Sequence, residues 1–167
     1  MSHSTASKPL EVLDQALCLE IDGEAFYREA AAATTDAGGR TMFLELAEQE
    51  ADHQRIIRRQ AESLQASGRW AGDARCAGVV CDLSQSLFPQ GAARAEAVGP
   101  RANELEALWF ALEKESESYE LYRQGAVQAT DDTAKAIYQY LMAAEREHFD
   151  VLMAAYEAIV GQQYRGE

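Results

Sequence analysis

Two four-residue stretches, Glu50-Ala-Asp-His53 and Glu145-Arg-Glu-His148, decide how this chain folds. Each places a histidine three residues after a glutamate, within a run rich in alanine and leucine. Side chains three residues apart on a helix lie on the same face. Each stretch therefore predicts a helix that presents one carboxylate and one imidazole together.

Apolar residues recur at helical spacing well beyond these motifs, as in Leu13, Leu17 and Ile21 near the start of the chain. Proline occurs only three times, which also favours helix. Turn-forming residues at 34–39 and 130–133 interrupt the pattern. We therefore predict four long helices, at about residues 10–36, 40–66, 100–129 and 133–160.

The connections between these helices indicate how they pack. The first two helices share a short turn, as do the last two, so each pair should form an antiparallel hairpin. The glycine-containing stretch between the pairs is long enough to run the length of a bundle. We predict an all-α, ferritin-like antiparallel four-helix bundle in a single domain, with a disordered tail at 1–8, the first hairpin at 9–66, a long crossover at 67–99 and the second hairpin at 100–161.

The two hairpins repeat one another at an offset of 95 residues, with no gap inside either copy. Duplicated packing would repeat the apolar residues and let the polar ones change. The repeat instead pairs charged and polar residues: Glu20 with Glu115, Tyr27 with Tyr122, Arg28 with Arg123, Glu50 with Glu145, and His53 with His148. A shared functional site explains this pattern better than packing alone.

The distances of these residues from each turn place them at one level of the bundle. Glu20 lies 17 residues before Ala37, the centre of the first turn, and Glu50 and His53 lie 13 and 16 residues after it. In an antiparallel hairpin, residues at similar distances before and after the turn lie at similar levels along the helix axis. Glu115, Glu145 and His148 lie at the same distances from Asp132, the centre of the second turn. The predicted metal ligands are therefore Glu20, Glu50, His53, Glu115, Glu145 and His148.

This ligand set favours iron or manganese, because thiolate-rich sites are the ones that select zinc or iron–sulfur clusters. Four buried carboxylates without metal would repel one another and take up protons. Two divalent ions would neutralise that charge and stabilise the fold. We predict two iron ions, with manganese or zinc as substitutes.

A formal net charge of -13 disfavours nucleic acid and anionic lipid as partners. No apolar run approaches the roughly 18 residues of a membrane span, and no signal-peptide core follows the polar first residues. We therefore expect a cytoplasmic protein. The three cysteines, Cys18, Cys76 and Cys81, fit neither a disulfide framework nor a zinc-ribbon spacing, and their role stays open.

One combination of motifs thus occurs twice, first as Glu20, Tyr27 and Glu50-x-x-His53, then as Glu115, Tyr122 and Glu145-x-x-His148. Over both hairpins, about 120 of the 167 residues, the chain resembles the rubrerythrin family of ferritin-like proteins. The resemblance implies a binuclear iron centre, reaction with hydrogen peroxide or dioxygen, and a homodimer. Tyr27 and Tyr122 are candidates for hydrogen bonds to ligand carboxylates beside the reacting centre.

Two features depart from the family pattern. Rubrerythrins carry a further glutamate three residues after the ligand of the third helix, and this chain has Ser118 at that position. Rubrerythrins also carry paired Cys-x-x-Cys motifs, which do not occur in these 167 residues. We therefore expect an external electron donor, such as a rubredoxin-like protein. Two alternatives to peroxide or dioxygen reduction stay open. One is an iron-binding or ferroxidase-type protein without a separate substrate, and the other is a structural bundle in which bound metal only stabilises the fold.

Overall fold

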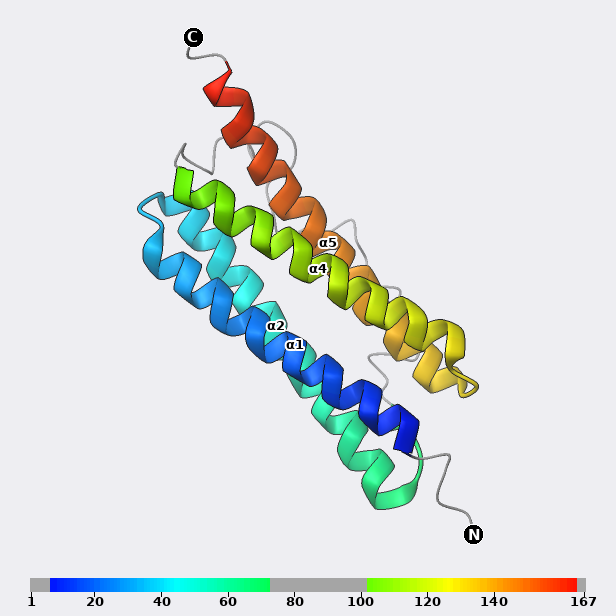
Figure 1. The fold of residues 1–167 in the computed structure, drawn as a ribbon. Coiled ribbons are helices and arrows are strands. Elements are labelled where there is room, and N and C mark those ends of the chain that lie inside the picture. The colour runs from blue at the N-terminus through cyan, green and yellow to red at the C-terminus, as the bar shows by residue number, and fades with distance from the viewer. Residues whose placement is uncertain (1–6, 73–101, 165–167) are drawn as a thin grey trace.

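The computed structural model describes residues 7–72 and 102–164. These residues form four helices and no strand: α1 Ser7–Ala33, α2 Ala37–Ser67, α4 Ala102–Gln128 and α5 Asp132–Gln163. Helices α1 and α2 form one hairpin, α4 and α5 form the other, and α1 packs against α4 (Figure 1). The predicted all-α four-helix bundle is confirmed, and each predicted helix lies within about three residues of its observed bounds.

Most of the predicted tail and crossover, including Cys76 and Cys81, lies outside the described residues. Cys18, on α1, is an exposed free thiol. No described helix has an apolar stretch of the length that crossing a bilayer requires.

Aspartates cap the second helix of each hairpin at equivalent positions of the repeat. The Asp36 carboxylate accepts a hydrogen bond of 2.7 Å from the Gly39 N–H, and the Asp131 carboxylate accepts one of 3.0 Å from the Ala134 N–H. Both aspartates are extended, as N-cap residues usually are. The Asp36 cap lets α2 begin at Ala37, three residues earlier than the adjacent glycines suggested.

Two apolar clusters fill the bundle on either side of a polar layer. One cluster includes Tyr27, Phe43 and Leu152, and the other includes Tyr122 and Leu141. All five of these side chains are buried. Each cluster draws on all four helices, so the interior between the hairpins is closed above and below the polar layer. The layer itself contains the residues of the predicted site.

Glu104, on α4, is buried. Its Oε1 accepts a hydrogen bond of 2.7 Å from the Thr34 hydroxyl, in the turn between α1 and α2. The Arg40 guanidinium donates to the Thr34 carbonyl at 3.1 Å. Glu104 also lies in the first turn of α4, where the helix dipole favours a carboxylate. These contacts join the first turn to the start of the second hairpin.

Candidate metal centre

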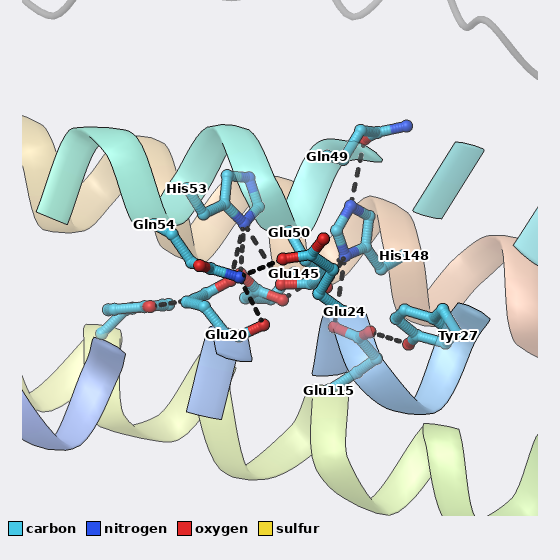
Figure 2. Close-up of polar contacts among 11 residues, drawn as sticks. Glu20, Glu24, Tyr27, Gln49, Glu50, His53, Gln54, Glu115, Glu145 and His148 are labelled. Carbon is cyan, nitrogen blue, oxygen red and sulfur yellow. Dashed lines mark hydrogen bonds and ion pairs between the residues drawn. The ribbon is translucent and has the colours of Figure 1, made fainter. Parts of the chain in front are cut away.

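The six predicted ligands converge in one buried layer between the two hairpins (Figure 2). Helices α1 and α4 each contribute one glutamate, and α2 and α5 each contribute a Glu-x-x-His pair. None of the six residues is more than 3% exposed. The spacing about the two turns therefore does bring their side chains to a common level.

Their ligand atoms form two overlapping groups, within each of which the atoms lie no more than 4.8 Å apart. One group is Glu20, Glu50, His53 and Glu145, and the other is Glu50, Glu115, Glu145 and His148. Glu50 and Glu145 belong to both groups. The arrangement suits two ions bridged by Glu50 and Glu145, with one terminal glutamate and one terminal histidine for each ion.

The distances between these candidate ligand atoms are those expected between neighbouring ligands of one metal ion. His53 Nδ1 lies 3.1 Å from Glu20 Oε2 and 3.2 Å from Glu145 Oε1. His148 Nδ1 lies 3.1 Å from Glu50 Oε1 and 3.4 Å from Glu115 Oε2. Two atoms about 2.1 Å from one ion are about 3.0 Å apart at a right angle and about 3.4 Å apart at a tetrahedral angle.

Three buried atoms of this layer make no well-aligned hydrogen bond, although each lies within 3.5 Å of an ion-pair partner: Glu115 Oε2, Glu145 Oε1 and His148 Nδ1. Leaving a buried polar group unpaired costs about 1–3 kcal/mol, so three in one layer indicate a missing binding partner. A divalent ion on each side would accept electron pairs from all three atoms. The donor set, its geometry and its unpaired atoms therefore fit a pair of metal ions.

Protons partly balance the charge of this layer in the absence of metal. Burial, followed by the charge of Glu145, raises the pKa of Glu20, and burial is also the largest cause of the raised pKa of Glu115. Burial alone would lower the pKa of both histidines, but the adjacent carboxylates reverse that effect and raise it. Glu20, Glu115 and the two histidines therefore hold protons, which a metal ion bound here would displace.

The two shared glutamates behave in the opposite way. Burial favours their neutral forms, but hydrogen bonds outweigh it and lower the pKa of Glu50, chiefly from Glu20 and His148. In Glu145, hydrogen bonds from both histidines likewise lower the pKa, to about 2. The carboxylates placed between the two sites are thus ionised, as bridging ligands need to be.

Two tyrosines connect the hairpins across the centre. The Tyr27 hydroxyl on α1 donates a hydrogen bond to Glu115 on α4, and the Tyr122 hydroxyl on α4 donates one to Glu20 on α1. Both tyrosines are buried, and burial together with the nearby carboxylates raises the pKa of each. Each neutral phenol thereby orients the terminal glutamate of the opposite hairpin.

Two glutamines that sequence reasoning missed also support the centre. His148 Nε2 donates to Gln49 Oε1 at 3.0 Å, which leaves Nδ1 facing the carboxylates. The Gln54 amide donates to the Glu20 carbonyl at 3.2 Å and to Glu24 at 2.7 Å (Figure 2). Their equivalents in the other hairpin are alanine and phenylalanine, so the repeat gave no signal for them.

Glu24, one turn from Glu20, is not in either ligand group. The Arg28 guanidinium donates to its Oε1 at 2.8 Å, and the Gln54 amide donates to its Oε2. These hydrogen bonds, the larger being from Arg28, lower the pKa of Glu24. Glu24 therefore serves as an acceptor at the rim of the site.

Small residues adjoin the centre where α1 faces α4. Gly23 is so close to Glu50 that a Cβ there would lie 3.4 Å from the Glu50 carboxyl carbon. Ser118, its counterpart in the repeat, is buried. Both line a pocket of about 460 Å³, which Tyr27, Glu50 and Glu115 also line. A separate pocket between α4 and α5 touches Glu115 and Glu145.

The fold and this layer define a ferritin-like helical bundle with a carboxylate–histidine centre able to hold metal. The rubrerythrin family model matches residues 11–76, which include nearly all of α1 and α2. This match confirms the resemblance seen in the motifs and is consistent with a ferritin-like protein of the rubrerythrin family.

Among solved structures, the chain is similar to a hypothetical protein from Pyrococcus furiosus, with a TM-score of 0.69 and 19% sequence identity. The similarity covers 92% of this chain and 91% of the other, and it concerns the fold. No curated protein matches the chain.

Proposed function

We propose that this protein is a binuclear non-haem iron oxidoreductase that reduces hydrogen peroxide or dioxygen. The observation that carries the proposal is the pair of buried ligand groups that share Glu50 and Glu145. Two ferrous ions, once bound, would supply the two electrons that peroxide reduction requires. The rubrerythrin match over the first hairpin supports the same chemistry.

The protein's own residues would hold and orient this centre. Glu50 and Glu145 would bridge the ions, with His53 and Glu20 terminal on one side and His148 and Glu115 terminal on the other. The Tyr27 and Tyr122 hydroxyls would keep the terminal glutamates in place during changes of charge. The apolar clusters above and below would exclude water from the buried layer.

Metal content followed by anaerobic oxidation would test this proposal. Protein purified without added metal should contain close to two ions per chain. Protein loaded with Fe(II) should consume about one equivalent of hydrogen peroxide per pair of ions, with an absorbance change in stopped flow. Fully loaded protein whose ferrous ions remain unchanged by both peroxide and dioxygen would contradict an oxidoreductase role.

An iron-handling protein that oxidises Fe(II) without a separate substrate is the second candidate. Ser118 favours it, because the family's additional glutamate is missing at that position. Assembly size separates the two: we expect a homodimer that takes electrons from a rubredoxin-like donor in the cytoplasm, whereas storage would require a cage-like oligomer. Sedimentation of the metal-loaded protein gives the answer.

A further inference from the structure

The pocket between α1 and α4 is larger than the proposed oxidants need. Its volume is about 460 Å³, whereas one water molecule occupies about 30 Å³ in the liquid, and hydrogen peroxide is little larger. Pockets of roughly 300–1,000 Å³ are typical of sites for organic ligands.

The walls of the pocket have two chemically different parts. Tyr27, Glu50 and Glu115 line its inner part and belong to the metal centre or contact it. Leu19, Phe26 and Phe110 supply its apolar walls, and the charged residues Asp22, Glu29 and Lys114 also line the pocket. A ligand of this pocket could therefore contact the polar groups of the centre and an apolar wall at the same time.

Aromatic rings form a continuous wall along the pocket. The ring centroids of Phe26 and Phe110 are 4.9 Å apart, and those of Phe26 and Tyr27 are 5.6 Å apart. Phe110 is 43% exposed, so this wall runs from the surface to the tyrosine that contacts Glu115. Such a wall gives an aryl or branched alkyl group a large contact area.

Small residues keep the space beside the centre open. Gly23 has no side chain, and Ser118 stands where the rubrerythrin pattern has a glutamate. The pocket thus has room for a substituent between the metal centre and the phenylalanines.

We infer that the substrate is an organic hydroperoxide, with its O–O group at Glu115 and its apolar group on Phe26 and Phe110. This inference rests on the proposed function. In such a reaction the O–O bond would break, and ferrous iron held by the centre would supply the two electrons required. The two oxygens take up two protons and leave as an alcohol and water, and the external donor protein returns both electrons.

Binding of the product alcohol tests the pocket without any redox reaction. The probe is 2-phenyl-2-propanol, titrated by NMR into protein loaded with redox-inert Zn(II). We expect saturable binding that is lost in Ala25→Trp, which places a bulky ring at an exposed residue lining the pocket. Phe110→Ala should weaken binding about tenfold by removing one aromatic wall.

Leu121→Ala is the matched control, because Leu121 is the counterpart of Phe26 in the second hairpin and does not line this pocket. Its affinity for the alcohol should equal that of the parent protein. Absence of binding at millimolar alcohol, or equal affinity in all four proteins, would overturn the inference.

Turnover with cumene hydroperoxide and with hydrogen peroxide completes the test. Ala25→Trp should lower kcat/KM for cumene hydroperoxide at least about tenfold more than it lowers kcat/KM for hydrogen peroxide. If iron-loaded protein reacts with hydrogen peroxide but the alcohol does not bind, the inference alone fails. If the alcohol binds but the iron is inert to every oxidant, the proposed function fails instead.

Discussion

The Tyr27 hydroxyl in the first hairpin donates a hydrogen bond to the carboxylate of Glu115 in the second. Replacing this tyrosine by phenylalanine would leave a buried carboxylate oxygen without its donor, which costs about 1–3 kcal/mol. We expect Tyr27→Phe to bind metal about 10- to 100-fold more weakly, because Glu115 is then less firmly oriented. Competition with a chelator measures the change in affinity.

Tyr122→Phe should have a similar effect through Glu20, whereas Tyr138→Phe is the matched control. Tyr138 is buried in the same apolar cluster as Tyr122. Nearby carboxylates help to raise the pKa of Tyr122, whereas burial alone raises the pKa of Tyr138, to about 12. Equal loss of metal affinity in all three variants would show that the tyrosines act only through packing.

The sharing of Glu50 and Glu145 between the two ligand groups predicts an unequal response to single substitutions. Glu20→Gln and Glu115→Gln each remove one terminal ligand and should leave about one ion per chain. Glu50→Gln removes a ligand from both sites and should leave less than one ion per chain. Elemental analysis after dialysis gives the stoichiometry.

Glu24→Gln is the control for these changes, since Glu24 is adjacent to the layer but contacts Arg28 and Gln54 instead. It should retain two ions. If Glu50→Gln and Glu20→Gln retained the same number of ions, Glu50 would not be a bridging ligand.

The protons held by the metal-free centre predict how its stability depends on pH. The folded-state pKa of Glu20 and Glu115 lies above 4.5, so the folded protein binds protons at these groups more tightly than the unfolded chain does. The stability that this proton binding contributes is lost as pH rises above 4.5. The raised pKa values of His53 and His148 act in the same direction: their contribution is complete below 6.5 and is lost as pH rises through the folded-state pKa.

We therefore expect the Tm of the metal-free protein to be lower at about pH 8 than at about pH 5. Glu50 and Glu145, whose pKa values are lowered, oppose this trend only below about pH 4.5, where their contribution to stability is lost as pH falls. Bound metal should reverse this pH dependence of Tm, because the ligands must lose their protons before they bind the metal. Melting curves with and without EDTA test both trends, and a metal-free Tm that rises from pH 5 to pH 8 would contradict them.

The repeat explains why so much of this centre was predictable. Equal distances from the turns fix the heights of Glu20 and Glu115, because a helix advances a constant 1.5 Å per residue. Gln49 and Glu104 could not be predicted in this way. Their roles depend on which residues face each other across helices, and neither has an equivalent of the same type in the other hairpin.

Gly125, on α4, shows how packing away from the ligands could reach the metal centre. A Cβ at this position would lie 2.9 Å from Cδ1 of the Tyr138 ring, closer than side chains normally approach. The Tyr138 ring stacks on Tyr122, with centroids 6.5 Å apart, and Tyr122 holds Glu20. A displaced Tyr138 ring would therefore disturb the donor of one terminal ligand.

We expect Gly125→Ala to destabilise the protein, although alanine is the better helix former by about 1 kcal/mol. Overpacking against a buried ring costs about 1–3 kcal/mol, which outweighs that gain. Metal should be lost first from the site of Glu20 and His53. Gly72→Ala, where a Cβ would meet no atom of the described residues within 4 Å, is the control. Denaturant melts and metal analysis report both effects, and a Gly125→Ala variant more stable than the parent would show that the Tyr138 ring moves aside freely.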